Sequence, residues 1–287
     1  MPVHVLTDST SYLPRELAAN LGIEVLSLYY CLDDHDFKRE LDLDELTSFY
    51  DALQESGEVA RTSPPSVDDF LRAYEPLLAD GSSVISVHIS SGMSDTCTHA
   101  RQAAERLEAE GKGGERVHVI DSAGAGGKTG IVALAARAAA VGGNAEEAAE
   151  RAREARQETQ MRILLNTLEF LRRGGRIGTA AAWLGSALDI KPILSVESEL
   201  KGVERVRTLE RGKEHLIEFA RRLAAGGADA WFVQHAKAPE EARALVERLQ
   251  EVFWRPPEFV SELGPVIGTH VGPGFVGVGA MPSRFLD

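Results

Sequence analysis

The 287-residue sequence is poor in cysteine, in long apolar runs and in basic residues. Its two cysteines, Cys31 and Cys97, form no CxxC pair, so no disulfide framework or cysteine zinc site is expected. No run of 18 apolar residues occurs, and no basic segment followed by an apolar run opens the chain. The sequence therefore predicts no transmembrane helix and no signal peptide, and two distant thiols favour a cytoplasmic location.

The shortage of basic residues excludes further classes of function. The chain has 31 Lys and Arg residues and 44 Asp and Glu residues, which gives a formal net charge of -13. A nucleic-acid partner needs a basic face, and so does electrostatic docking on anionic lipid. The eight histidines show no HxH or HExxH spacing, so no metal site is expected. Histidines in apolar strands, such as His88, are interpreted as hydrogen-bonded or half-buried residues.

What the chain does contain is alternating strand and helix patterns in its first half, within a composition that is 44% hydrophobic. Alternation of this kind predicts a parallel sheet with helices on its faces, an α/β/α sandwich. The expected strands are 3–6, 23–30, 84–89 and 117–121, and the expected helices are 14–20, 41–53, one capped by Ser66 with Asp69, 93–111, 128–141 and 144–160.

The second half predicts an α/β domain whose sheet is mixed and largely antiparallel, because several strands are separated only by turns such as "ESELKGV". Strands are expected at 161–168, 190–196, 204–209, 228–236, 265–271 and 275–281, with helices at 180–188, 212–224 and 239–253. We place the domain boundary between residues 158 and 159. The chain is thus expected to form an N-terminal domain of residues 1–158 and a C-terminal domain of residues 159–287.

A glycine-rich turn, "DSAGAGGKTG", invites comparison with a phosphate-binding loop. Gly127, Lys128 and Thr129 match the end of G-x-x-x-x-G-K-[ST], but Ser122 stands where the first glycine is required. The alternative is a tight turn whose small residues allow close packing of helix on strand. We therefore do not expect ATP to bind here, and interpret Asp121 and Ser122 as part of the rim of the sheet edge.

Hydroxyl-rich and glycine-rich loops support two further hypotheses. Thr62 and Ser63 in "RTSPPS", Ser91 and Ser94 in "SSGMSDT", and His270 in "GTHVGPG" could converge on one carboxylate as neutral donors. Alternatively, Ser94 and His270 could act as nucleophile and base of an acyl hydrolase, which only geometry can establish.

Seven stretches, taken in order, resemble the DegV family of the fatty-acid-binding FakB type. They are "LTDSTSYLP", "RTSPPSVDDF", "SVHISSGMSDT", "VIDSAGAGG", "LRRGGRIG", "LDIKPIL" and "GTHVGPGFVGVG", and the resemblance covers about residues 3–284. It implies two α/β domains with a fatty acid between them, its chain in an apolar tunnel. By motif position, its carboxylate would be held by Thr62, Ser63, Ser94 with Ser91 nearby, and His270, which could change charge near neutral pH.

The resemblance also implies a carrier without catalytic residues, cofactor or metal. Its partners would be a long-chain fatty acid and a separate ATP-dependent fatty acid kinase subunit, which forms an acyl phosphate for phospholipid metabolism in bacteria. No nucleic acid is implied, and at most transient membrane contact. Arg172, Arg173 and Arg176 in "LRRGGRIG" are candidates for contact with phosphate or the kinase, or else a solvated basic turn.

One position departs from the family pattern. Asp95 stands where the family has glycine, between Ser94 and Thr96. A carboxylate buried there would repel a bound carboxylate. We expect Asp95 either to point away as an N-terminal residue of the following helix or to alter the head-group preference.

Overall fold

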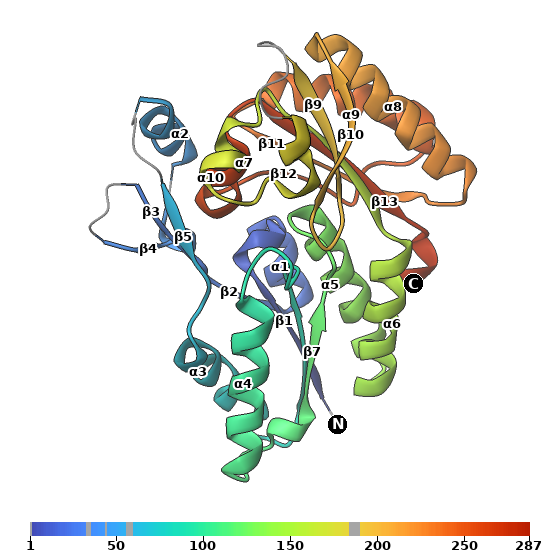
Figure 1. Ribbon diagram of the computed structural model, residues 1–287. Helices are drawn as coiled ribbons and strands as arrows, with labels where there is room; N and C mark the ends of the chain where they lie inside the picture. Colours follow the sequence, from blue (N-terminus) through green and yellow to red (C-terminus); the bar gives the residue numbers. More distant parts are fainter. Residues whose placement is uncertain (1, 33–35, 44, 56–59, 184–189) are drawn as a thin grey trace.

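The computed structural model describes residues 2–32, 36–43, 45–55, 60–183 and 190–287, which fold around three β-sheets (Figure 1). The first sheet has the strand order β2-β1-β6-β7, and all its neighbours pair in parallel. This confirms the parallel sheet expected for the first half of the chain. Its strands are β1 (Val3–Asp8), β2 (Ile23–Leu26), β6 (Ser83–His88) and β7 (Val117–Asp121).

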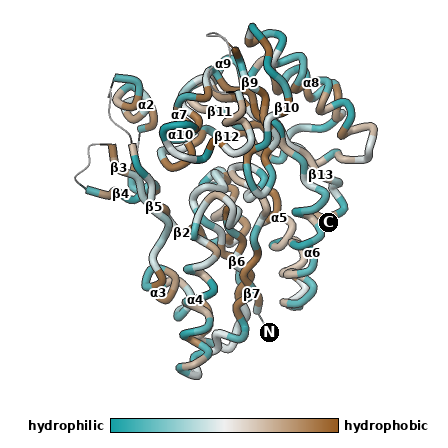
Figure 2. The backbone as a smooth tube through the Cα atoms, in the orientation of Figure 1, coloured by the Kyte–Doolittle hydropathy of each residue, from teal (hydrophilic) through white to brown (hydrophobic). Residues whose placement is uncertain are grey.

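Helices cover both faces of this sheet, as in an α/β/α sandwich. Adjacent residues of β1 serve opposite faces, since Val5 joins the core beneath α5 and α6 while Leu6 joins the core beneath α3 and α4. The strands therefore carry apolar residues on both faces, and Figure 2 shows hydrophobic stretches along β6 and β7. The helices are α1 (Arg15–Leu21), α3 (Val67–Leu78), α4 (Thr96–Ala109), α5 (Gly127–Ala140) and α6 (Ala145–Glu158).

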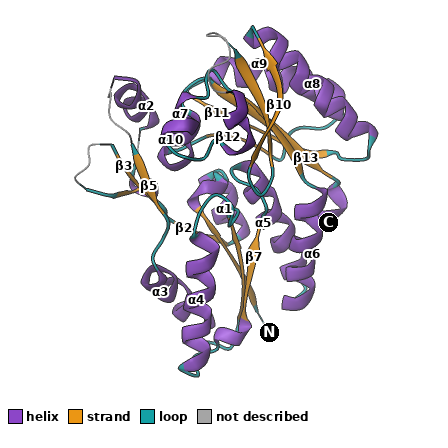
Figure 3. Cartoon of the chain, viewed as in Figure 1, coloured by secondary structure: helices purple, strands orange, loops and turns teal. Residues whose placement is uncertain are grey.

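A small antiparallel sheet was not expected from the sequence. Its order is β4-β3-β5, and it stands to one side together with α2 (Figure 3). The prediction of one strand over residues 23–30 is wrong. The strand breaks at Ser27 and Leu28, so this stretch supplies β2 to one sheet and β3 to another. The elements are β3 (Tyr29–Cys31), β4 (Lys38–Arg39), α2 (Leu46–Glu55) and β5 (Arg61–Ser63).

The third sheet is mixed and largely antiparallel, as predicted for the second half. Its order is β10-β9-β8-β13-β11-β12, and only β11 and β12 pair in parallel. Helices α8 and α9 pack on its outer face, and α5 contacts β11. The strands are β8 (Gln160–Leu164), β9 (Lys191–Val196), β10 (Leu200–Val206), β11 (Ala230–Ala236), β12 (Phe259–Glu262) and β13 (Phe275–Met281), and the helices are α7 (Glu169–Arg173), α8 (Leu209–Ala225), α9 (Pro239–Phe253) and α10 (Pro265–Val271).

The prediction of a strand at 265–271 is wrong, because this stretch forms α10. Its β-branched residues favour a strand, but Pro265 opens the first helical turn, where its missing N–H costs nothing. The Val266 N–H is satisfied from a distant part of the chain, by Glu40 Oε1 at 2.8 Å. This long-range cap is invisible in the local sequence.

Other predicted boundaries also differ from those in the structure. Strand β12 was missed, and β10 begins at Leu200, so the turn expected over "ESELKGV" is limited to residues 197–199. The expected helix 180–188 is a 3-10 helix, Gly178–Trp183, as far as the described residues go, because 184–189 lie outside them. Further 3-10 turns are Ser9–Ser11, Glu40–Asp42, Gly114–Arg116 and Ser283–Phe285.

The fold class expected from the sequence is confirmed, a parallel-sheet sandwich followed by a mixed-sheet unit. Helix α6 ends at Glu158 and β8 begins at Gln160, and the boundary between residues 158 and 159 stays a prediction. Across the described ranges, every helix is too short or too polar to cross a bilayer.

Candidate functional site

A narrow apolar cavity lies between the inner face of the mixed sheet and the loops that follow the parallel strands. Its volume is about 60 Å³. In β8, Met161 and Ile163 face it, whereas the intervening Arg162 stacks on Phe219 of α8. Apart from Gln234 and two basic side chains, its lining is apolar: Ile89, Met93, Ala125, Gly126, Met161, Ile163, Leu171, Val196, Leu200, Leu263, Ile267, Val271 and Phe275.

His270 lies at the wall of this cavity and is hydrogen-bonded to Thr62. The His270 Nε2 and Thr62 Oγ1 atoms are 2.9 Å apart, and they join α10 to β5 of the small sheet. Burial, reinforced by the nearby Arg176 guanidinium, lowers the pKa of His270 to about 4. The imidazole is therefore neutral at pH 7, so the expected change of charge near neutral pH does not occur in this environment.

The second ring nitrogen of His270 is buried against glycine. Among the described residues, Nδ1 has no hydrogen-bond partner. A Cβ on Gly174 would lie 2.1 Å from Nδ1, so only glycine fits beneath the ring. The sequence predicted no role for the two glycines of "LRRGGRIG". In the structure the first of them, Gly174, leaves room for the His270 ring.

A polar mouth of about 300 Å³ adjoins the apolar cavity, and the two share Met93, Arg176 and Leu200. Ser91 and Ser94 line this mouth, as does Asp95, which is exposed at the N-terminal end of α4. Because Asp95 is exposed at the start of α4 and also lines the mouth, both expectations for it stay predictions.

Hydrogen bonds hold the serine loop at the sheet edge. The Ser94 hydroxyl is 2.8 Å from Thr96 Oγ1, and the Ser91 N–H donates to Asp121 Oδ2 at 3.0 Å. Asp121 also accepts from the N–H of Ala123 at 2.7 Å. Asp121 therefore fixes the loop that carries Ser91, in agreement with its interpretation as a rim residue.

The arrangement of Ser94 and His270 does not resemble a hydrolase site. Ser94 bonds to Thr96, and the imidazole Nε2 bonds to Thr62. The nitrogen that would need a carboxylate partner packs on Gly174 instead. A nucleophile joined to its base and a base joined to its orienting acid are both required for that chemistry, and neither bond is present.

The remaining candidates differ in whether they line the cavity. Ser63 directs its hydroxyl to the Pro64 carbonyl at 3.3 Å, and neither it nor Thr62 is among the described residues that line the cavity. Arg172 and Arg173 are paired with Glu169 on the exposed face of α7. Arg176 differs from them, because it lines both the cavity and the mouth and its Nε lies 3.4 Å from the Met93 carbonyl.

The glycine-rich turn does not present a phosphate cradle. The Gly127 N–H donates to Gln234 Oε1, and the Ser122 hydroxyl is 2.9 Å from Thr129 Oγ1. A Cβ on Gly127 would lie 2.2 Å from the ring of Phe232 in β11. The turn therefore needs small residues for close packing of helix on strand, as expected, and the strand belongs to the mixed sheet.

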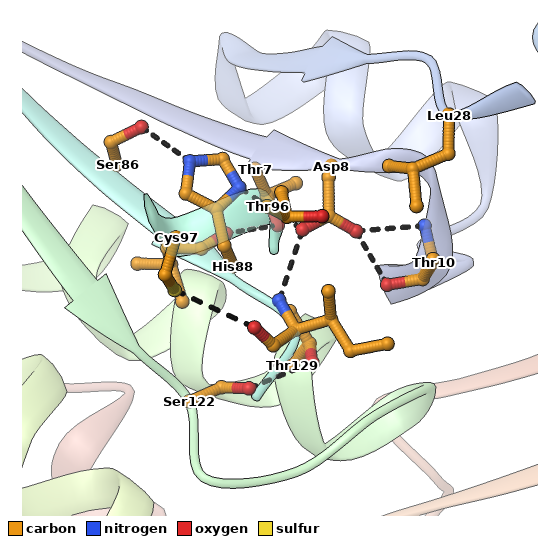
Figure 4. Close-up of polar contacts among 12 residues, drawn as sticks. Thr7, Asp8, Thr10, Leu28, Ser86, His88, Thr96, Cys97, Ser122 and Thr129 are labelled. Atoms are coloured by element: carbon orange, nitrogen blue, oxygen red, sulfur yellow. Dashed lines mark hydrogen bonds and ion pairs between the residues drawn. The ribbon is translucent and has the colours of Figure 1, made fainter. Parts of the chain in front are cut away.

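A second histidine lies in a fully buried polar network beneath the site (Figure 4). His88 Nδ1 is 3.0 Å from Asp8 Oδ2, and Ser86 Oγ is 2.6 Å from His88 Nε2. Asp8 also accepts from the N–H groups of Thr10 and Ile89. Every side chain of this Asp-His-Ser row is inaccessible to solvent, so it joins the ends of β1 and β6 rather than forming a reactive site.

Comparisons with known proteins agree with this geometry. The family model described as "Uncharacterised protein, DegV family" matches residues 2–283. A DegV domain-containing protein of Clostridium perfringens is 34% identical over 286 residues, which cover 97% of this chain and 98% of the relative. The chain belongs to the DegV family.

Two solved structures of DegV proteins are similar over nearly the whole chain. One is a fatty-acid-binding DegV family protein from Thermus thermophilus, with a TM-score of 0.87, 31% identity and coverage of 98% of this chain and 100% of that one. The other is DegV, a fatty acid binding protein from Bacillus subtilis, with a TM-score of 0.84, 29% identity and coverage of 98% and 99%. Both relatives bind fatty acids, and they share the fold described above.

Proposed function

We propose that this DegV protein binds a long-chain fatty acid, with the hydrocarbon chain in the apolar cavity and the carboxylate near Thr62 and His270. The observation that supports this proposal most directly is an apolar cavity that ends at a neutral imidazole, which is hydrogen-bonded to a hydroxyl. A fatty acid needs this combination, because each buried methylene contributes about 0.8 kcal/mol while the head group needs only orientation. The fatty-acid-binding relatives support the assignment.

The Thr62–His270 pair supplies a donor for the head group. Because Nδ1 has no partner in the described structure, the neutral ring is best satisfied with its proton on Nε2, donated to Thr62 Oγ1. The Thr62 hydroxyl proton is then available to a carboxylate. Ser94, which lines the neighbouring mouth, is the second proposed donor, and Ser91 and Ser63 are weaker candidates.

The hydrocarbon chain requires the cavity to widen. A volume of about 60 Å³ holds only a few water molecules, far less than a long acyl chain. Met93 and Met161 line the cavity, and their unbranched side chains change rotamer more readily than branched ones.

We further propose that the bound acid is presented to an ATP-dependent fatty acid kinase in the cytoplasm. Arg176 supports this role, since it alone among the three predicted arginines lines both cavity and mouth. There it can meet the phosphate that the kinase transfers to the bound carboxylate. Arg172 and Arg173 lie on the exposed side of the same segment and are proposed as kinase contacts.

Two measurements test this function. Denaturing extraction of the purified protein followed by mass spectrometry should release stoichiometric fatty acid, and the protein alone should not hydrolyse a chromogenic ester. Ester turnover lost in Ser94→Ala would establish a hydrolase instead. For the kinase step, the Arg176→Ala variant should keep fatty-acid binding but slow ATP-dependent acyl phosphate formation when a cognate kinase is added. An unchanged rate would remove Arg176 from that role.

A further inference from the structure

A second and larger cleft lies on the other side of the N-terminal turn of α10. Its volume is about 960 Å³, within the range of small-molecule sites. No described residue lines both this cleft and the apolar cavity. It opens beyond the carboxyl end of β1, the edge at which parallel sheets bind ligands. The cleft therefore has the position and size of an additional site.

Two buried polar atoms at this cleft have no hydrogen-bond partner among the described residues. They are Ser11 Oγ and Glu40 Oε2, from side chains of residues that are 1% and 5% exposed. Both residues line the cleft. Unsatisfied buried polar groups are rare in folded proteins because each costs about 1–3 kcal/mol. Two such groups at one cleft therefore favour a polar ligand there.

The other oxygen of Glu40 is fully engaged, which fixes the carboxylate. Glu40 Oε1 accepts from the Tyr12 hydroxyl at 2.6 Å and from the Val266 N–H at 2.8 Å. The Tyr12 hydroxyl in turn accepts from the N–H of Ile267 at 3.0 Å. The Ser9 hydroxyl lies close enough to the Glu40 carboxyl to lower its pKa, whereas Oε2 has no hydrogen-bond partner among the described residues. Glu40 Oε2 is thus the buried, unpartnered oxygen of a carboxylate held in a rigid frame.

The charges around the cleft favour a cation. Glu24, Glu40 and Glu262 line it, against Arg15, whose guanidinium donates to the Leu41 carbonyl. Burial is the main cause that raises the pKa of Glu40 to about 7, and the negative charge of Asp8 adds to it. An ammonium group at Oε2 would compensate this carboxylate and supply the missing donor.

The rest of the lining favours an apolar body on the same ligand. Leu13, Ala18, Ile23, Leu43, Leu46 and Val260 contribute apolar side chains. We propose that this cleft binds an organic primary amine, with its ammonium on Glu40 Oε2 and the Ser11 hydroxyl and its hydrocarbon part against α1 and β2. This site is independent of the fatty-acid site, because it uses other residues and the opposite charge.

Isothermal titration of the full chain with n-hexylamine tests the proposal, with n-hexanol as the matched neutral probe. Hexylamine should bind at one site, at least about tenfold more tightly than hexanol, since a charge-assisted hydrogen bond is stronger than a neutral one. The same affinity is expected when palmitate is present. Absence of saturable binding, equal binding of hexanol, or competition by palmitate would each overturn the proposal.

Two variants locate the amine. Glu40→Gln retains an oxygen for Tyr12 and Val266 but places a donor at the second position, so hexylamine affinity should fall at least tenfold, or about 1.4 kcal/mol. Ser11→Ala removes an unpartnered hydroxyl, so the protein should fold normally and bind hexylamine about threefold to tenfold more weakly. Thr98→Ala, at an exposed position of α4, is the control and should bind hexylamine as the natural protein does. Unchanged binding in both test variants would refute the site.

Discussion

Two histidines in this protein each bond to a hydroxyl. Comparing them shows which one has a structural role and which one is placed to meet a ligand. His88 lies between Asp8 and Ser86, with both ring nitrogens satisfied and no exposure to solvent. His270 bonds to Thr62 with one nitrogen, has no partner for the other among the described residues, and lines a cavity. The chemical groups are alike, but only the second pair adjoins space that a ligand can enter.

The largest expected effect concerns the buried pair. Asp8→Ala leaves His88 and the N–H groups of Thr10 and Ile89 without their acceptor. The free energy of unfolding, measured by urea denaturation, should fall by about 3–5 kcal/mol. Asp42→Ala removes only an exposed ion pair with Arg39 and should cost less than about 1 kcal/mol. Equal losses in the two variants would remove the distinction drawn for His88.

The next effect concerns the cavity beside His270. Ala125→Phe should fill part of it and exclude about three methylenes of palmitate, worth about 0.8 kcal/mol each, so affinity falls at least about 50-fold. Ala109→Phe on the exposed face of α4 is the control. Both affinities are measured by calorimetry, with circular dichroism to verify folding. If Ala125→Phe still binds palmitate normally, the acyl chain lies elsewhere.

A smaller effect is expected at the head group. Thr62→Val should weaken palmitate binding about tenfold, since it removes one hydrogen bond to a charged group. Ser63→Ala should leave affinity nearly unchanged, because the Ser63 hydroxyl turns to Pro64. The reverse order of the two variants would assign the carboxylate to Ser63.

The smallest effect is a change in the titration of His270, followed by NMR of its ring protons. Its pKa is about 4 in this structure, below the ordinary value of about 6.5. The lowered pKa means that this group stabilises the fold above pH 6.5 and that this contribution is lost as the pH falls toward 4. A bound carboxylate nearby should raise the pKa by about one unit or more. An identical pKa with and without palmitate would place the head group away from His270.

Local patterns predicted the fold class well, because alternating strands and helices specify a parallel sheet without knowledge of distant contacts. They failed where distant residues decide the outcome. Residues 265–271 form a helix whose first turn is capped by Glu40, more than 200 positions away in sequence. The split of 23–30 between two sheets likewise depends on pairing of Tyr29 and Tyr30 with Ser63 and Thr62.

The candidate site shows the same division. Hydroxyl loops and the histidine stretch were visible in the sequence, and the Thr62–His270 bond joins two of those predictions. The cavity lining was not proposed, although the alternation of Met161 and Ile163 around Arg162 carried a signal for it. A role for Gly174 could not be predicted, because this position requires glycine only when the His270 ring packs against it.

The central claim, that a fatty acid's carboxylate lies at the Thr62–His270 pair, is tested most directly by NMR of carboxyl-¹³C palmitate bound to the delipidated protein. The account predicts one bound resonance at a ratio of one to one, which follows the protonation of His270 and shifts in Thr62→Val. A bound resonance that is unchanged by Thr62→Val and by substitution of His270, or no bound resonance at all, would contradict it.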